Sequence, residues 1–288
     1  QIYSENFKKE KILHFENNND QLFSIVKNYN LREILNKSLL KSKYFKKIVI
    51  KKKITDFDKY DLIINTDFYS DLNKKFFNKK IEKRYNSLAY CTVINHEKVS
   101  NDVAIQIFTK KGPLAFLPIS NNKTSIVYSI HNTKNRNKEN VKQLIHQYNF
   151  KYKIKKIDNV ESFELTSFSL RSYYNHKFLA FGDLLHRIHP LAGQGFNMTI
   201  RDIKTFLEII ENRNNLGLSL DYSINSEFEN KTKHKNFIFA NGIDFIHEFF
   251  NFERKIQNNT LSKSIQFLGK QPSINKVFTN LADKGINI

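Results

Sequence analysis

The chain has 288 residues, 40% of them hydrophobic and 14% aromatic, which is the composition of a globular protein with one large or two ordinary domains. Its single cysteine, Cys91, excludes an intrachain disulfide framework and a cysteine-based zinc site, and favours a reducing cytoplasmic compartment. The formal net charge of +19 raises the question of a nucleic-acid partner, but the lysines are scattered along the whole chain, which argues against nucleic-acid binding.

The densest group of lysines flanks the apolar residues 48–50. It comprises Lys41, Lys43, Lys46, Lys47, Lys51, Lys52 and Lys53. We interpret it as a solvated strand and its approaches, with a basic face toward anionic lipid as the alternative. We find no signal peptide and no apolar run of spanning length. The sequence therefore predicts a cytoplasmic protein, with peripheral association with the inner membrane left open.

The first part of the chain predicts strands and one helix. Residues 2–16 alternate loosely in polarity and predict a strand pair. Residues 22–41 carry apolar side chains at helical spacing and predict an amphipathic helix. Two further strands are predicted at 46–54 and 60–65.

The middle of the chain, from about residue 84 to 169, consists of short β-rich runs separated by polar turns. The predicted strands are 90–95, 103–109, 114–118 and 124–130. One helix is predicted at 138–148. This pattern is typical of a mostly antiparallel sheet with one covering helix.

An apolar strand at 177–181 and an amphipathic helix at 196–211 are predicted next, joined by a polar loop. The remainder, about 219–286, is predicted to be helical. Four glycines mark predicted breaks in these helices: Gly217, Gly242, Gly269 and Gly285.

The connection at 182–202 holds three of the chain's eight glycines and one of its four prolines. It lies between a buried strand and a helix, where open α/β sheets bind ligands. Asp183, just beyond the strand, can accept hydrogen bonds from sugar-like hydroxyls. Gly182 leaves room for close backbone approach, and Pro190 stiffens the loop.

The start of the following helix is suited to a flat, negatively charged ligand. Gly193 and Gly195 let the main chain lie against such a ligand without a Cβ in the way. The amides of Gly195, Phe196 and Asn197 lie at the helix N-terminus, where unpaired N–H groups and the dipole favour negative charge. A reduced flavin, which carries an anion along one edge of its ring, fits these requirements.

Residues 182–197 resemble the second flavin motif of the class A flavoprotein monooxygenases, Gly-Asp-x-x-His-x-x-x-Pro-x-x-Gly-x-Gly-x-Asn. The segment His-Pro-x-Ala-Gly-Gln-Gly-x-Asn, which includes Gln194, is most similar to the ubiquinone-biosynthesis hydroxylase branch. Arg32, in a Leu-Arg-x-x-Leu pattern, resembles a family helix whose start approaches the flavin. Asp67, followed by Ser70, resembles the family's Asp-Gly-x-x-Ser motif, with one residue fewer between the aspartate and the serine.

The resemblance implies an α/β fold: a Rossmann-like, para-hydroxybenzoate hydroxylase-like FAD-binding domain that lacks its first βαβ segment, a mostly antiparallel β substrate domain and C-terminal helices. We expect residues 1–20 to belong to the substrate domain as a strand pair, and 83–171 to form the rest of it. Residues 21–82 and 172–288 would belong to the FAD-binding domain.

The resemblance also implies a function. The intact protein would bind FAD, be reduced by NADH or NADPH, and use O2 to hydroxylate an aromatic ring, as expected for a polyprenyl phenol in ubiquinone biosynthesis. Its FAD contacts would come from Gly182, Asp183, Pro190, Gly193, Gln194, Gly195, Phe196, Asn197, Arg32 and Asp67. No catalytic side chain and no metal is expected. Other ubiquinone-biosynthesis proteins are candidate partners.

The chain departs from the family at its start and in the Asp67 motif. The family's strand, Gly-x-Gly-x-x-Gly turn and helix, which hold the adenosine diphosphate half of FAD, do not occur in it. It begins with Gln1 and its only methionine is Met198, so we expect that upstream sequence is absent. Phe68 stands where the family has glycine, and Asn73 stands where it has arginine, which puts the pyrophosphate and nicotinamide side in doubt.

Other interpretations remain open. Asp183, His186 and His189 could be metal ligands, although loop histidines are more often hydrogen-bonded structural groups. Asp67 could be a turn or capping residue, and Arg32 could be solvated. The chain could instead hydroxylate a small soluble aromatic, act as another flavin oxidoreductase, or be a non-catalytic remnant or complex subunit.

Overall fold

The computed structural model describes residues 1–5, 11–15, 21–48, 57–131, 138–189, 193–256 and 263. The chain forms two compact units. The first contains Gln1–Phe15 and Leu62–Ile288, and the second contains Glu16–Asp61.

The larger of two sheets in the first unit has nine strands. Along the sheet the order is β12-β9-β4-β7-β6-β5-β1-β2, and β8 also pairs with β4. All pairings are antiparallel except that of β1 with β5. The strands are β1 (Ile2–Ser4), β2 (Lys11–Leu13), β4 (Lys80–His96), β5 (Ile105–Thr109), β6 (Gly112–Ser120), β7 (Lys123–His131), β8 (Ile154–Ile157), β9 (Glu161–Leu170) and β12 (His186–Arg187).

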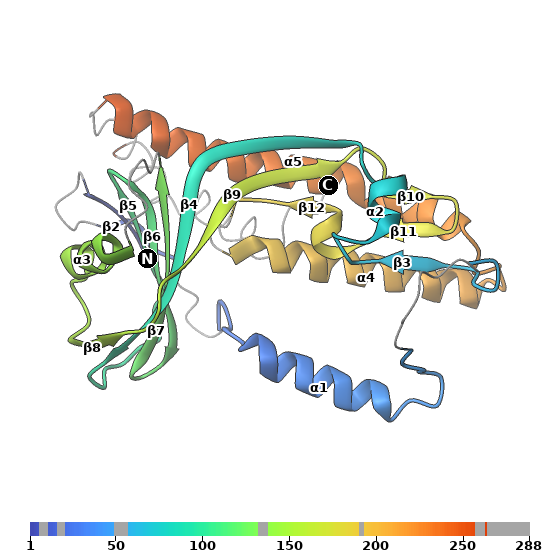
Figure 1. The fold of residues 1–288 in the computed structure, drawn as a ribbon, viewed down its shortest axis with the longest axis horizontal. Coiled ribbons are helices and arrows are strands. Elements are labelled where there is room, and N and C mark those ends of the chain that lie inside the picture. The colour runs from blue at the N-terminus through green and yellow to red at the C-terminus, as the bar shows by residue number, and fades with distance from the viewer. Residues whose placement is uncertain are drawn as a thin grey trace. The chain divides into compact units, whose positions relative to one another are not determined.

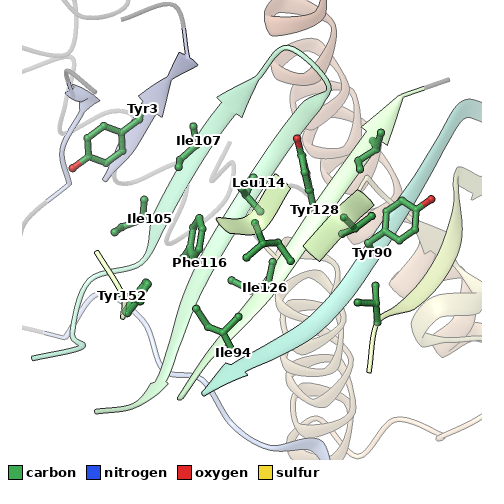
Figure 2. Packing of buried hydrophobic residues seen from close by; sticks show 14 residues of the cluster. Tyr3, Tyr90, Ile94, Ile105, Ile107, Leu114, Phe116, Ile126, Tyr128 and Tyr152 are labelled. Atoms are coloured by element: carbon green, nitrogen blue, oxygen red, sulfur yellow. The ribbon is translucent and has the colours of Figure 1, made fainter. Parts of the chain in front are cut away.

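Alternating side chains of this sheet build the main hydrophobic core. In β6, Leu114 and Phe116 are buried while their neighbours are half-buried, because successive residues of a strand point to opposite faces. Helix α3 (Lys138–Tyr148) contributes Val141 and Ile145 to the same core. Figure 2 shows these side chains gathered across the central strands.

The smaller sheet has the order β10-β11-β3. Its strands are β3 (Ile63–Asn65), β10 (Tyr174–Asn175) and β11 (Phe178–Ala180). Helix α2 (Asp71–Phe76) follows β3 and leads into β4. Strands β4 and β9 are long enough to run as a ribbon from the large sheet toward the small one (Figure 1).

Two long helices complete the first unit. Helix α4 (Gln194–Asn215) follows the short 3-10 helix η2 (Gly182–Leu184), and helix α5 (Ser223–Ile256) follows α4. The rings of Phe181, Phe206 and Phe228 pack together at centroid distances of 5.3–5.7 Å, which joins the end of β11 to both helices.

The second unit contains helix α1 (Asn28–Leu40), which has no buried residue. This helix corresponds to the one predicted at 22–41, but it begins six residues later than predicted. The strand predicted at 46–54 is absent at 46–48, and its remaining residues lie outside the described part of the chain.

The helix predicted after residue 219 is present as α5, and of the predicted breaks one is confirmed and one is wrong. Gly217 has a positive φ of 64° and follows the end of α4, as expected for a helix-terminating glycine. Gly242, however, lies inside α5 and does not interrupt it. Gly269 and Gly285 lie outside the described residues. No helix in the described ranges has the length and apolar character needed to cross a membrane.

Candidate functional site

The two sequence segments predicted to approach a flavin leave the small sheet at the same edge. Strands β3 and β11 are parallel, with Asn65 opposite Ala180 at their carboxyl ends. The Phe181 amide extends this pairing by donating to the Asn65 carbonyl at 2.9 Å. Since ligands of open α/β sheets bind beyond the carboxyl ends of parallel strands, this edge is the candidate site.

Gly182 and Asp183 form the turn directly beyond β11. Gly182 has a φ of +67°, a conformation that glycine adopts without the strain of a Cβ. Asp183 is exposed, while the following Leu184 and Leu185 are almost fully buried and anchor the turn. A Cβ at Gly182 would lie 4.0 Å from Thr199 Cγ2, so this turn packs against the first turns of α4.

The N-terminus of α4 has the exposure that a ligand site requires. Gly193 is the N-cap residue, with a φ of +65° and no side-chain cap. Phe196 and Asn197 are exposed, and Gln194 is buried. The first amides of a helix have no intrahelical acceptor and carry the positive end of the dipole, so this end favours an anion.

Among the described residues, nothing prevents a larger residue at position 195. Its backbone has no positive φ, and an added Cβ would meet Ile188 Cγ1 at an ordinary contact distance of 3.9 Å. The predicted role of Gly195, close approach to a ligand, is compatible with this geometry. Pro190, predicted to border the ligand, lies outside the described residues.

Asp67 forms a turn beyond β3. Its carboxylate accepts from the Tyr69 amide at 2.9 Å, and its own amide donates to Asn65 Oδ1 at 3.2 Å. Ser70 caps α2 by accepting from the Asn73 amide. These contacts give Asp67 a role in forming the turn. Because Asp67 also lies beyond the carboxyl end of β3, its predicted contact with a ligand is compatible with the geometry.

Asn65 provides an independent sign of a ligand at this edge. The side chain is 6% exposed, and its Oδ1 accepts from the Asp67 amide and the Ser70 hydroxyl. Its Nδ2 has no hydrogen-bond partner among the described residues. Since a buried donor without a partner is costly, a polar group of a bound cofactor would fit beside it.

The ring of Phe68, which replaces the family's glycine, packs among aromatic and cationic side chains. It lies 5.7 Å from the Phe168 ring. The Lys80 ammonium and the Arg187 guanidinium lie 5.4 and 5.5 Å from the Phe68 centroid. A cation above an aromatic ring is attracted electrostatically to the face of the ring. The phenylalanine that replaces glycine is therefore accommodated by local packing.

His186 forms a buried hydrogen-bonded group with two side chains that were not predicted as functional, Asp202 and Asn236. His186 Nε2 lies 2.7 Å from Asp202 Oδ2, with both side chains 2% exposed. Asn236 Nδ2 donates to Asp202 Oδ1 at 2.9 Å. The motif includes His186, but nothing in the sequence indicated Asn236, because α5 meets α4 only in the folded molecule.

Tyr85 is a further residue that the sequence did not single out. Its ring lies edge-on to the ring of His189 at a centroid distance of 4.9 Å. His189 directly precedes Pro190 in the sequence. Its hydroxyl hydrogen-bonds Asp244 of α5 and lies 2.9 Å from Ser167 Oγ. Burial, together with the hydrogen bond to Asp244, raises the pKa of Tyr85. At neutral pH the side chain is therefore a neutral hydrogen-bond donor.

Arg32, also predicted to contact the flavin, belongs to the second unit. It is exposed on α1, and its flavin contact stays a prediction. Among the described residues there is no group of three histidine, cysteine, aspartate or glutamate side chains that could hold a metal ion. His186, weighed above as a ligand, is bonded to Asp202 instead.

Comparison with known proteins supports the flavin interpretation. Residues 82–211 match the family described as FAD binding domain. The 3-demethoxyubiquinol 3-hydroxylase of Escherichia coli is 28% identical over 162 residues, covering 54% of this chain and 41% of that protein. Ubiquinone hydroxylase UbiL of Rhodospirillum rubrum is 26% identical over 144 residues, covering 46% and 33%. The chain thus spans less than half the length of these relatives.

Solved structures share the fold at low sequence identity. Klebsiella pneumoniae HpxO, complexed with FAD and uric acid, superimposes with a TM-score of 0.62 at 11% identity, covering 77% of this chain and 60% of that one. The p-nitrophenol 4-monooxygenase PnpA of Pseudomonas putida gives 0.63 at 11% identity, covering 79% and 60%. The predicted family resemblance and fold class are confirmed. Residues 82–211 match the FAD binding domain family, and the chain shares the fold of the class A flavin monooxygenases.

Proposed function

We propose that the intact protein is an FAD-dependent monooxygenase that hydroxylates an aromatic ring, with NADH or NADPH as reductant and O2 as oxidant. One observation carries this proposal. The parallel strands β3 and β11 end side by side, so that Gly182-Asp183 and the buried Asn65 amide share one edge, against the first turns of α4.

The residues at this edge would bind and orient the cofactor. The Asp183 carboxylate would accept hydrogen bonds from the ribityl hydroxyls, and the amides of residues 195–197 would face the anionic edge of the ring. Gly193 and Gln194 would line the same side, with Pro190 at the ring's border. Bound FAD would supply the electron-transfer and oxygen chemistry, while the protein excludes water around it.

A polyprenyl phenol on the route to ubiquinone is the substrate we propose. The relatives named for ubiquinone hydroxylation support this choice. The net charge of +19 is compatible with peripheral binding to the anionic inner membrane, where such a lipid resides. Other ubiquinone-biosynthesis proteins would then be partners. A small soluble aromatic substrate, or a non-catalytic role for this chain, are the competing outcomes.

Flavin titration of the purified chain tests the proposed cofactor site. The residues proposed for the site would contact the flavin half of FAD, whereas the glycine-rich turn that holds the adenosine half in the family does not occur in the sequence. We therefore expect weak binding, with dissociation constants on the order of 10–100 µM for FAD and for riboflavin alike. The measurement is the shift in flavin absorbance and the quenching of flavin fluorescence.

The comparison of the two flavins makes this test specific. Binding of FAD about a hundredfold tighter than riboflavin would show that other residues of the chain hold the adenosine half. Failure of both flavins to bind would contradict the proposed cofactor site.

A further inference from the structure

The buried group around Asp202 lies outside every contact discussed above for the cofactor. Its three members come from three separate elements: His186 from β12, Asp202 from α4 and Asn236 from α5. Both carboxylate oxygens of Asp202 are engaged, one by His186 and one by Asn236.

The His186–Asp202 contact bridges the two ends of the cofactor motif. His186 follows Asp183 by three residues, and Asp202 lies two turns inside α4, so this contact closes the loop between the carboxylate and the helix amides. Strand β12 in turn pairs with β9, which ties His186 to the large sheet. His186 is thereby fixed both to the large sheet and to α4.

Apolar and cationic contacts join the same three segments. Ile188, Met198 and Ile243 are buried together, one from the loop, one from α4 and one from α5. The Arg201 guanidinium lies 4.6 Å from the centroid of the Phe239 ring, which again joins α4 to α5. The hydrogen-bonded group therefore lies within a packed junction, where a small shift in one element is transmitted to the others.

We propose that Asp202 is a positioning residue of the candidate flavin site, holding the Asp183 turn and the N-terminus of α4 in register through His186, with Asn236 of α5 as its second anchor. The identity of the ligand rests on the proposed function. The holding of the two segments does not, because it follows from the contacts alone. Asn236 lies beyond residues 82–211, so this role extends the site to a helix outside the matched family segment.

Exchanging the carboxylate of Asp202 and the amide of Asn236 between the two positions tests this role. In Asn236→Asp, two carboxylates would face each other in a buried place, which is unfavourable. In the double variant Asp202→Asn/Asn236→Asp, the new amide can accept from His186 through its oxygen and donate to the new carboxylate through its nitrogen. The double variant should therefore restore what the single variant loses.

Two readouts are needed: riboflavin affinity, and amide hydrogen exchange of residues 185–189 and 198–203. For Asn236→Asp we expect faster exchange in both segments and about tenfold weaker riboflavin binding, the size of coupling seen within one hydrogen-bond network. Exchange in the β6–β7 hairpin should not change. The double variant should recover both readouts, and Glu211→Gln, an exposed change on α4, should alter neither.

A second pair of variants covers the case in which Asn236→Asp does not fold. His186→Gln keeps a side-chain N–H donor for Asp202, whereas His186→Phe removes it. The glutamine variant should bind riboflavin more tightly than the phenylalanine variant and exchange more slowly at 198–203.

Unchanged exchange at 185–189 and 198–203 in Asn236→Asp would overturn the inference, as would faster exchange with undiminished riboflavin affinity. If the unmodified chain binds no riboflavin, the proposed function fails. The exchange measurements then decide by themselves whether Asp202 holds the two segments.

Discussion

Asp183 combines exposure with a fixed backbone, which suits a residue that binds a ligand rather than one that stabilises the fold. Its side chain is exposed, whereas the turn beneath it is anchored by Leu184 and Leu185. A substitution at Asp183 should therefore change ligand binding without a large change in stability, because exposed side chains outside caps and networks contribute little to it.

We expect Asp183→Ala to weaken riboflavin binding by about 10- to 100-fold, since a hydrogen bond to a charged group is worth about 1.5–3 kcal/mol. Glu211→Ala, an exposed acid on α4, is the matched control and should bind like the unmodified chain. Titration of both variants, together with their unfolding midpoints in urea, gives the comparison. Equal affinities for the two variants would remove Asp183 from the site.

At the scale of elements, the hairpins of the large sheet could be predicted well because they obey a strict alternation. The four strands predicted between residues 90 and 130 and the helix at 138–148 all appear in the structure. Strand β4, however, begins at Lys80, ten residues before its predicted start. Its first residues, Lys80–Arg84, are exposed and mostly charged, so no apolar pattern reveals the part that pairs with β9.

Gly112 at the start of β6 shows how closely this sheet is packed. Its φ is +141°, and an added Cβ would lie 2.0 Å from the Ser129 carbonyl oxygen. We expect Gly112→Ala to destabilise the protein by about 3 kcal/mol, from backbone strain and overpacking. For Gly242→Ala in α5, the added methyl group would meet none of the described residues within 4 Å, and the variant should be more stable by about 0.5–1 kcal/mol.

Urea unfolding of the two alanine variants measures both effects. The opposite signs make them mutual controls, since the chemical change is the same in each. A Gly112→Ala variant as stable as the unmodified protein would mean that the β6–β7 hairpin can shift away from the new methyl group.

At the scale of the whole molecule, the fold and one half of the candidate site could be predicted from the sequence, and the rest could not. The segment at 182–202 has a long local pattern, so Gly182, Asp183 and Gly193 could be identified from it. Asn65 and Asn236 carry no such pattern. Their importance depends on which segments meet in three dimensions, which one sequence does not reveal.

The proposed substrate is also a question for the whole molecule, because it depends on where the protein resides. With the intact protein, and with FAD and NADH or NADPH supplied, the proposed function predicts that a polyprenyl phenol in anionic vesicles gains one oxygen atom, detected by mass spectrometry. The protein should sediment with these vesicles and be released by salt, since screening weakens attraction between exposed charges. Neutral vesicles should bind it less. Hydroxylation of 4-hydroxybenzoate alone would favour a small soluble substrate instead.

The parallel pairing of Ile63–Asn65 with Phe178–Ala180 has a consequence for folding. The entire segment that forms β4 to β9 lies between these two strands in the chain. Contacts between remote segments form slowly, because the intervening loop must first be closed. We therefore expect the edge that would hold the cofactor to assemble late, after the large sheet has folded. A flavin present during refolding would then stabilise the last step and leave the rate of sheet formation unchanged.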